Sequence, residues 1–265
     1  MAHLNLRNRD LGPVRGVLFD KDGTLSHSEP RLIELADDRI EESARRFQQR
    51  GADGTMLLEL KDLLKRTFGR SPQGVIPDGT LAVASRHHNL LSTATVFCQM
   101  NLSWPQSLLL AEEVFAQVDA CRQKRHPGEN PAGLLPDAAR LLRELADAGI
   151  ICAVISNDTT AGIQQFLDQH QLNDCISGLW SADHHPAKPD PGAVHGLCSQ
   201  LNLAVDTCAL IGDADTDLLM ARQAGIGLTL GYVAGWHREP TLTGHEHLIS
   251  HWSELTATKD EMSKR

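Results

Sequence analysis

Three continuous apolar runs in this 265-residue chain each stop at a polar residue, and this pattern restricts the fold more than any other feature. The runs span residues 14–19, 150–155 and 208–211. They are followed by Asp20, by Ser156 and by Gly212-Asp213. Short apolar runs without polar alternation are typical of strands in a parallel sheet that helices cover on both faces.

Further strands and helices are predicted to alternate in the second half of the chain. Weaker strand patterns lie at residues 175–180, 226–230 and 247–249, and helical patterns lie at 137–148, 159–170, 191–203 and 216–224. Such alternation requires right-handed crossovers and predicts an α/β fold with a doubly wound parallel sheet. In this fold ligands bind at the carboxyl ends of the strands, where all of the polar segments described below are expected to lie.

Residues 26–130 show a different pattern, with apolar residues at helical spacing and no convincing strand. Within residues 31–49 one apolar stripe is formed by Leu32, Leu35, Ala36, Ile40, Ala44 and Phe47. Ser103-Trp104-Pro105 predicts the start of a helix that continues through Cys121.

This difference predicts two domains. Residues 1–25 and 131–265 are expected to form the α/β core, and residues 26–130 an all-helical second domain. The turn formers His126-Pro127-Gly128 and Asn130-Pro131 predict a hinge at its exit.

Composition narrows the classes of partner. Hydrophobic residues make up 41% of the chain and charged residues 22%, which is usual for a globular protein. The net charge of -9 repels nucleic acid and anionic membranes, so neither is expected as a partner. No stretch resembles a signal peptide or a membrane span, and a cytoplasmic location is expected. The six cysteines include no Cys-x-x-Cys pair, which favours free thiols.

Two aspartates after the first apolar run form a candidate catalytic pair. In Asp20-Lys21-Asp22-Gly23-Thr24 their spacing places both carboxylates on one side of an extended backbone. Close like charges raise one pKa, so that one acid can attack while the other carries a proton. Gly23 allows a sharp turn, and Thr24 can bond that turn or a phosphate. Taken alone, the segment could equally be an acidic turn.

Two further segments are candidates for phosphate binding only because they accompany this aspartate pair. Ser156-Asn157 can hold a phosphate oxygen, although a turn or helix cap is the commoner role of such a pair. Lys188 lies between Pro186 and Pro189, which keep its backbone extended. A lysine in such a loop is usually a solvated charge, but here it would neutralise a nucleophile and a phosphate.

Three acids follow the third run, at Asp213, Asp215 and Asp217. Their simplest role is to cap the following helix and to complement its dipole, and Asp215 could do only that. Three carboxylates beside a second acidic loop repel one another, however, and such hard oxygen ligands suit Mg²⁺. The sequence therefore predicts a Mg²⁺ site.

As a set, these segments resemble the motifs of the haloacid dehalogenase (HAD) superfamily. The resemblance covers residues 14–25 and 134–255. Its motifs, in order, are Phe19-Asp20-Lys21-Asp22-Gly23-Thr24-Leu25, Ser156-Asn157, Lys188-Pro189-Asp190-Pro191, and Ile211-Gly212-Asp213 running to Asp217 and Ala224-Gly225.

The resemblance assigns roles to these residues. It implies that Asp20 attacks phosphorus to give an aspartyl-phosphate and that Asp22 serves as acid and then as base. It implies that Lys188 and Ser156 bind the phosphoryl group, and Thr24 and Asn157 are predicted to bind substrate beside them. The Mg²⁺ ligands that it implies are Asp20, the backbone carbonyl of Asp22, Asp213 and, in support, Asp217.

The helical insertion lies where phosphoglycolate-phosphatase-like members of the superfamily carry a cap that closes over the substrate. Such a lid excludes water and contributes selectivity. Within it we predict substrate contacts by Arg70 and Arg86, although each is more often a surface arginine. Histidines could suggest a second metal, but their spacings fit no common ligand pair. They are His87, His88, His184, His185, His245, His247 and His251.

The sequence therefore predicts a Mg²⁺-dependent phosphatase acting on a small phosphorylated metabolite. Asp22 disfavours dehalogenases and phosphonate-cleaving relatives, which the resemblance implies lack an acid there. One alternative is a phosphomutase of the beta-phosphoglucomutase type, which returns the phosphoryl group to a sugar phosphate. Another is a non-enzymatic binding protein with the same fold, which the cost of burying so many unpaired charges argues against.

Overall fold

The computed structural model describes residues 2–125 and 132–259. Its contacts divide the chain into a core unit, Met1–Ser28 with Pro131–Arg265, and a helical unit, Glu29–Asn130. The division falls after Ser28 rather than after residue 25, because β4 (Ser26–His27) pairs with β7 (Gly133–Leu134) inside the core unit. The predicted hinge at 126–131 lies outside the described residues.

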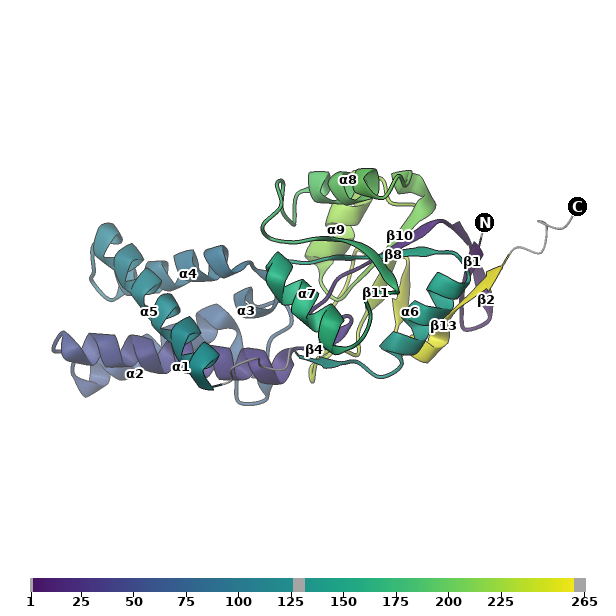
Figure 1. Ribbon diagram of the computed structural model, residues 1–265. Coiled ribbons are helices and arrows are strands. Elements are labelled where there is room, and N and C mark those ends of the chain that lie inside the picture. Colours follow the sequence, from purple (N-terminus) through teal and green to yellow (C-terminus); the bar gives the residue numbers. More distant parts are fainter. Residues whose placement is uncertain (1, 126–131, 260–265) are drawn as a thin grey trace, which may run out of the picture. The chain divides into compact units, whose positions relative to one another are not determined.

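A six-stranded sheet with every neighbouring pair parallel forms the centre of the core unit (Figure 1). The strand order is β12-β11-β10-β3-β8-β9. The strands are β3 (Gly16–Phe19), β8 (Ile151–Ile155), β9 (Ile176–Trp180), β10 (Cys208–Gly212), β11 (Leu228–Tyr232) and β12 (His247–Ile249). The predicted parallel sheet and its six strands are confirmed, and no strand end differs from its predicted position by more than two residues.

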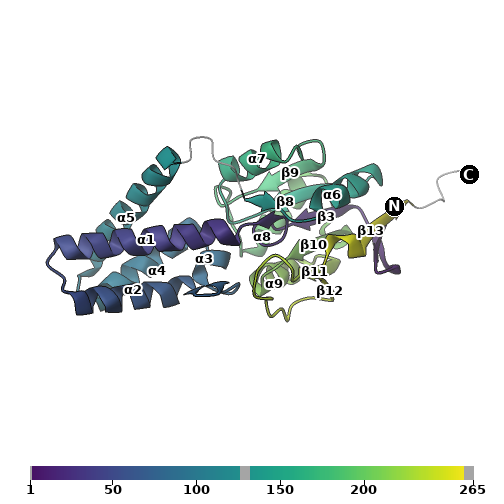
Figure 2. The same ribbon diagram turned by 90° about the horizontal axis from the view of Figure 1, so that it is seen from below.

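Helices cover both faces of this sheet, as its apolar strands require (Figure 2). The helices are α6 (Ala138–Asp147), α7 (Thr160–Gln169), α8 (Pro191–Gln200) and α9 (Asp215–Ala224). Along β3, Val17 and Phe19 enter the apolar cluster that contains α6 and α7, whereas Leu18 enters the cluster with α8 and α9. Because both faces are buried, no polar residue interrupts the strand.

The core unit also contains a three-stranded antiparallel sheet that the sequence analysis missed. Its order is β13-β1-β2, with β1 (Ala2–Leu6), β2 (Arg9–Val14) and β13 (Leu255–Lys259). Arg7 and Asn8 join β1 to β2 with φ values of 51° and 63°, the left-handed conformation that suits a two-residue hairpin turn. The last described segment, Leu255–Lys259, thus belongs to the core unit through its pairing with β1.

In residues 29–125, the part of the helical unit that the structure describes, there are five helices and one short ribbon. They are α1 (Glu29–Gln49), α2 (Gly54–Phe68), β5 (Arg70–Ser71), β6 (Gly74–Val75), α3 (Thr80–Val83), α4 (Arg86–Gln99) and α5 (Trp104–Arg125). The predicted helices over 31–49 and from Trp104 are confirmed. The ribbon β5–β6 departs from the all-helical expectation, since Gly74 adopts a φ of 139° and the carboxylate of Glu29 accepts the N–H of Val75 at 3.0 Å.

No helix in the described part of the chain combines the length and the apolar character needed to cross a membrane.

The three-stranded sheet generates a test of stability. Leu4 in β1 is fully buried, so Leu4→Ala should lower the free energy of unfolding of the core unit by about 2 to 4 kcal/mol through lost burial and a residual cavity. Urea denaturation followed by tryptophan fluorescence measures this loss. The matched variant Leu219→Ala, at a side chain 48% exposed on α9, should change stability by about 0.5 kcal/mol or less. Equal effects of the two substitutions would contradict a structural role for β1.

Candidate active site

The carboxyl ends of three adjacent strands bring the predicted residues together. Asp20 follows β3, Ser156 follows β8, and Asp213 follows β10. Lys188 reaches the same edge from the loop between β9 and α8. Its Nζ donates to Asp20 Oδ1 at 2.7 Å and to the backbone oxygen of Ile155 at 3.3 Å. The ammonium therefore joins the ends of β3 and β8.

Asp20, Asp213 and Asp217 form a buried carboxylate cluster around this lysine. One oxygen of each lies within 4.8 Å of the others. Lys188 Nζ also lies 2.7 Å from Asp217 Oδ1. The side chains of Lys188, Asp20 and Asp217 are only 3%, 9% and 7% exposed. The ammonium of Lys188 thus pairs with two of the three carboxylates, and the cluster has an excess of negative charge when all three are ionised.

This donor set fits a hard divalent cation. Burial, together with the nearby Asp20 and Asp217, raises the pKa of Asp213 well above its ordinary value. A cation with oxygen ligands would offset this repulsion, and Mg²⁺ prefers such ligands with waters completing its shell. Within the described residues, no other group of three His, Cys, Asp or Glu side chains has its ligand atoms so close together. A contribution from the backbone carbonyl of Asp22 stays a prediction.

Burial dominates the acidity of the predicted nucleophile. It raises the pKa of Asp20 to about 6, while Lys188 opposes this shift and Asp217 adds to it. The predicted repulsion from Asp22 is present but is the smallest of these causes. The expectation that one acid of the pair has a raised pKa therefore holds for Asp20, with a different main cause.

The surroundings of Asp22 shift its pKa in the opposite direction. Burial disfavours its charge, but Lys21 Nζ at 2.6 Å and the hydroxyls of Ser26 and Ser28 outweigh burial and lower its pKa. Lys21 also lies 3.2 Å from Asp158 and thereby links the loops that follow β3 and β8. Asp22, which is predicted to carry the proton, therefore lies in surroundings that favour its ionised form, because Lys21 lies beside it.

The smaller polar residues shape the loops of the site. Thr24 Oγ1 donates to Asp213 Oδ1 at 2.8 Å, and Ser156 Oγ accepts the N–H of Asp158 at 3.1 Å. Asn157 is half-buried directly after Ser156. These contacts place all three predicted substrate-binding residues on the loops around Asp20. Phosphate binding by them stays a prediction.

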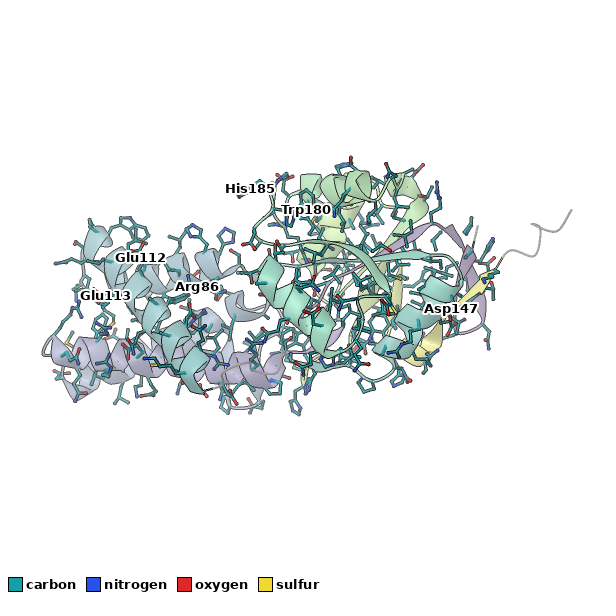
Figure 3. The ribbon with its side chains drawn as sticks, in the orientation of Figure 1. Arg86, Glu112, Glu113, Asp147, Trp180 and His185 are labelled. Carbon is teal, nitrogen blue, oxygen red and sulfur yellow. The ribbon has the colours of Figure 1, made fainter. Side chains whose placement is uncertain are left out.

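Arg70 and Arg86 both belong to the helical unit and both have an acidic partner. Arg70 forms two bonds of 3.1 Å with the carboxylate of Asp37. Arg86, labelled in Figure 3, bonds Asp119 Oδ2 at 3.0 and 2.6 Å and lies over the ring of Phe115. Substrate contact by either arginine stays a prediction, and it would require competition with these ion pairs.

Sequence reasoning missed Trp236, whose indole Nε1 donates to Asp213 Oδ2 at 2.5 Å. The signal was available, since Gly235-Trp236 lies in the loop after β11 at the same carboxyl edge of the sheet. Trp252 was missed as well, and its Nε1 donates to the backbone oxygen of Thr24 at 3.2 Å.

The singled-out histidines make other contacts. His184 stacks on Trp180 with 4.7 Å between ring centroids and bonds Ser181 at 2.8 Å (Trp180 is labelled in Figure 3). His251 Nδ1 bonds Ser253 Oγ at 2.6 Å. None of these rings belongs to the carboxylate cluster.

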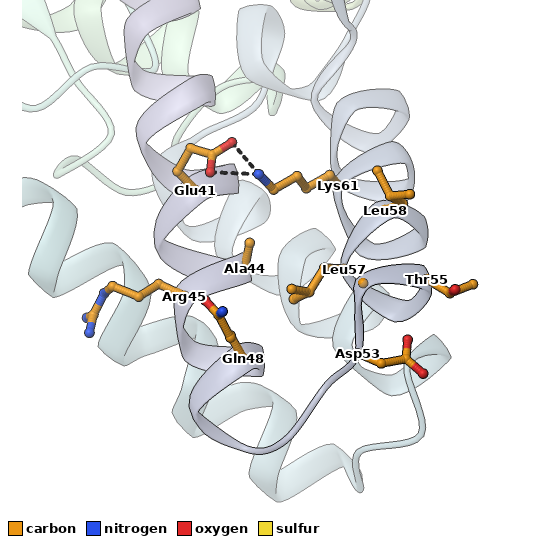
Figure 4. Close-up of a pocket in the computed structure, with 10 residues that line it drawn as sticks. Glu41, Ala44, Arg45, Gln48, Asp53, Thr55, Leu57, Leu58 and Lys61 are labelled. Atoms are coloured by element: carbon orange, nitrogen blue, oxygen red, sulfur yellow. Dashed lines mark hydrogen bonds and ion pairs between the residues drawn. The ribbon is translucent and has the colours of Figure 1, made fainter.

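A groove between α1 and α2 of the helical unit is separate from the predicted site residues (Figure 4). Lys61 bonds both oxygens of Glu41 at 2.7 Å on its wall, and Leu58 on α2 is 73% exposed. The residues that line it include neither Arg70 nor Arg86.

Comparison with known proteins shows which family this chain belongs to. Residues 14–225 match the model of the haloacid dehalogenase-like hydrolases. The chain belongs to this family. The predicted membership of the HAD superfamily is confirmed, and the HAD-like chain is an enzyme of the hydrolase class.

Curated relatives match this HAD-like hydrolase over most of its length. A phosphoglycolate phosphatase of Vibrio cholerae is 26% identical over 250 residues, which cover 89% of this chain and 92% of the relative. A phosphoglycolate phosphatase of Yersinia pestis is 27% identical over 247 residues, with 91% of each chain covered. The crystal structure of a predicted phosphoglycolate phosphatase from Haemophilus somnus has the same fold, with a TM-score of 0.63, 17% identity, and coverage of 92% of this chain and 97% of that chain.

The charge of the cluster predicts an unusual effect of Asp213→Asn. Because the pKa of Asp213 is raised in the folded state, its favourable contribution exists at low pH and is lost as the pH rises through that folded pKa. With chelator at pH 7.5, Asp213→Asn should therefore be more stable than the parent, by on the order of 1 kcal/mol or about 2–4 °C.

Thermal unfolding between pH 4 and pH 8 tests this prediction. The difference should shrink toward pH 4, and excess Mg²⁺ should stabilise the parent more than the variant. If the variant is less stable than the parent at pH 7.5 with chelator, the ionised carboxylate of Asp213 does not destabilise the folded protein, and the prediction is wrong.

Proposed function

We propose that this hydrolase is a Mg²⁺-dependent phosphatase that acts on a small phosphorylated metabolite through an aspartyl-phosphate intermediate. The observation that supports it most is the buried Asp20 carboxylate, held by Lys188 inside a cluster that fits a divalent cation. Phosphoryl transfer needs a positioned nucleophile and fixed positive charge for the phosphate oxygens. Two curated relatives that match most of the chain are named as phosphatases, and this gives the proposal independent support.

In the proposed reaction Asp20 attacks phosphorus and the bond to the leaving oxygen breaks. Because Lys21 favours the ionised form of Asp22, this step starts from the minor protonated form, which gives its proton to the leaving oxygen. The resulting carboxylate then takes a proton from the water that attacks the aspartyl-phosphate and frees Asp20. Lys188 holds Asp20 Oδ1 and so fixes the orientation of the carboxylate for attack. Asp20, Asp213 and Asp217 would hold Mg²⁺, which supplies positive charge for the phosphoryl oxygens when it is bound.

Substrate choice is proposed from the relatives. Because the curated relatives are phosphoglycolate phosphatases, 2-phosphoglycolate is the first compound to test. We propose further that the helical unit acts as the cap and that Arg70 and Arg86 contact the substrate. A net charge of -9 and six free cysteines support a reaction in the cytoplasm on a small molecule rather than on nucleic acid or membrane.

Asp20→Asn tests the chemistry. Phosphate release from 2-phosphoglycolate and a panel of small phosphate esters should require Mg²⁺, and it should fall at least about 10³-fold in the variant because the nucleophile is lost. Asp168→Asn, the same change at an aspartate whose carboxylate bonds Gln164 and Asn173 on the α7 surface, should keep the parental rate.

Product analysis separates the alternatives. A hexose 1-phosphate that is isomerised without release of phosphate would establish the phosphomutase. If no compound of the panel turns over, or if turnover survives the loss of Asp20, the phosphatase proposal fails and the binding protein becomes the better interpretation.

Arg70→Ala and Arg86→Ala test the proposed substrate contacts. If each arginine binds the substrate, its loss should raise KM by about tenfold, corresponding to a lost charge-assisted bond, while kcat changes less. Steady-state kinetics on the best substrate of the panel measure this. Asp37→Ala and Asp119→Ala are the matched controls, because they remove the other half of each ion pair and should not raise KM. If both arginine variants have the same kcat and KM as the parent, neither Arg70 nor Arg86 contacts the substrate.

A further inference from the structure

Two donors from separate loops hold the carboxylate of Asp213. Thr24 Oγ1 donates to Oδ1 at 2.8 Å, and the indole Nε1 of Trp236 donates to Oδ2 at 2.5 Å. Asp213 is 3% exposed and Trp236 is 6% exposed. With both oxygens bonded, the carboxylate cannot rotate about its Cβ–Cγ bond without breaking a hydrogen bond of a buried group, and such a loss is costly.

Two glycines allow the tryptophan to come this close. A Cβ atom on Gly235 would lie 1.7 Å from the backbone oxygen of Gly23, so only glycine fits at this crossing of two loops. A Cβ atom on Gly23, whose φ is +84°, would lie 2.3 Å from Asp213 Oδ2 and 2.4 Å from Trp236 Nε1. The nucleophile loop and the loop after β11 are thus packed backbone to backbone beside Asp213.

The far end of the same loop is anchored by a neighbouring acid. Asp215 accepts the N–H and the hydroxyl of Thr243, each at 2.7 Å, and the N–H of Gly244 at 2.9 Å. This finding gives Asp215 a role apart from the metal cluster. The loop after β11 is therefore fixed at two points by the segment that carries Asp213, and its indole is presented in one orientation.

We propose that Trp236 is a positioning residue that fixes the Asp213 carboxylate for metal binding. A neutral N–H donor in a negatively charged, buried cluster stabilises the ionised carboxylate without adding a competing cation. The Trp236 N–H also occupies one lone pair of Asp213 Oδ2, so that the remaining lone pairs of the carboxylate are available to the metal. The consequence for Mg²⁺ rests on the proposed function, whereas the contact between Trp236 and Asp213 does not.

The first experiment tests the contact with chelator present. The chain has four tryptophans, and ¹H–¹⁵N spectra show one indole signal for each. The signal lost in Trp236→Phe should lie downfield of the others, as expected for a short bond to a carboxylate, and it should move in Asp213→Asn. An indole signal that does not respond to Asp213→Asn would overturn the proposal.

The second experiment measures Mg²⁺ affinity from the thermal shift produced by increasing Mg²⁺, without reference to turnover. Trp236→Phe keeps the ring and removes the N–H, and it should weaken Mg²⁺ binding about tenfold, as loss of an outer partner of a metal ligand does. Trp252→Phe is the matched control, because Trp252 is fully buried and donates to the backbone oxygen of Thr24 rather than to a carboxylate. It should lower thermal stability and change Mg²⁺ affinity by less than about threefold.

These results separate the two proposals. Equal Mg²⁺ affinity in the parent and in Trp236→Phe, or an equal loss in both tryptophan variants, would overturn the positioning role. If the parent binds no Mg²⁺ while the indole responds to Asp213→Asn, the metal-dependent phosphatase fails, and with it the effect on metal affinity. Gly235→Ala provides a further variant, since it retains the indole but displaces its loop and should reproduce Trp236→Phe.

Discussion

The ammonium of Lys188 is the interaction on which the arrangement of the core unit's acidic edge depends. A buried ion costs several kcal/mol unless it is paired, and here Lys188 contacts Asp20, Asp217 and the backbone oxygen of Ile155. These partners come from the loop after β3, from α9 and from the end of β8. A single side chain thus holds three segments together, and its neutralising charge is what allows so many carboxylates to be buried at one point.

The parts of this arrangement that were predictable follow from one rule about parallel sheets. The apolar runs that became β3, β8 and β10 have no polar alternation because both of their faces are buried. Once they are parallel neighbours, Asp20, Ser156 and Asp213 must meet at the same edge, whatever the details of the side chains. Lys188 was predictable only by association, since nothing local distinguishes it from a solvated loop lysine.

What could not be predicted depends on contacts between distant segments. The bond from Trp236 to Asp213 and the link from Lys21 to Asp158 require the packed loops. The place of Gly235-Trp236 after a strand indicates the edge of the sheet at which Trp236 lies, but it does not identify Asp213 as its partner. The three-stranded sheet was missed because β13 contains only two apolar residues, Leu255 and Ala257, and because it pairs with a strand about 250 positions earlier in the sequence. The pKa of Asp20 was ascribed to a neighbouring charge, but burial, which the sequence does not measure, is the larger cause.

The pairing of β1 with β13 has a consequence for the order in which the protein is made. Asn5 bonds Thr258, a residue 253 positions later. During synthesis, β1 leaves the ribosome before every strand of the parallel sheet, yet one of its two neighbours emerges after all of them. Until then Leu4 and Leu6 lack part of their cover, and Phe19 lacks the edge contact with Trp252. The nucleophile strand β3 is therefore translated before the other strands of the parallel sheet, and it is among the last to be completely packed.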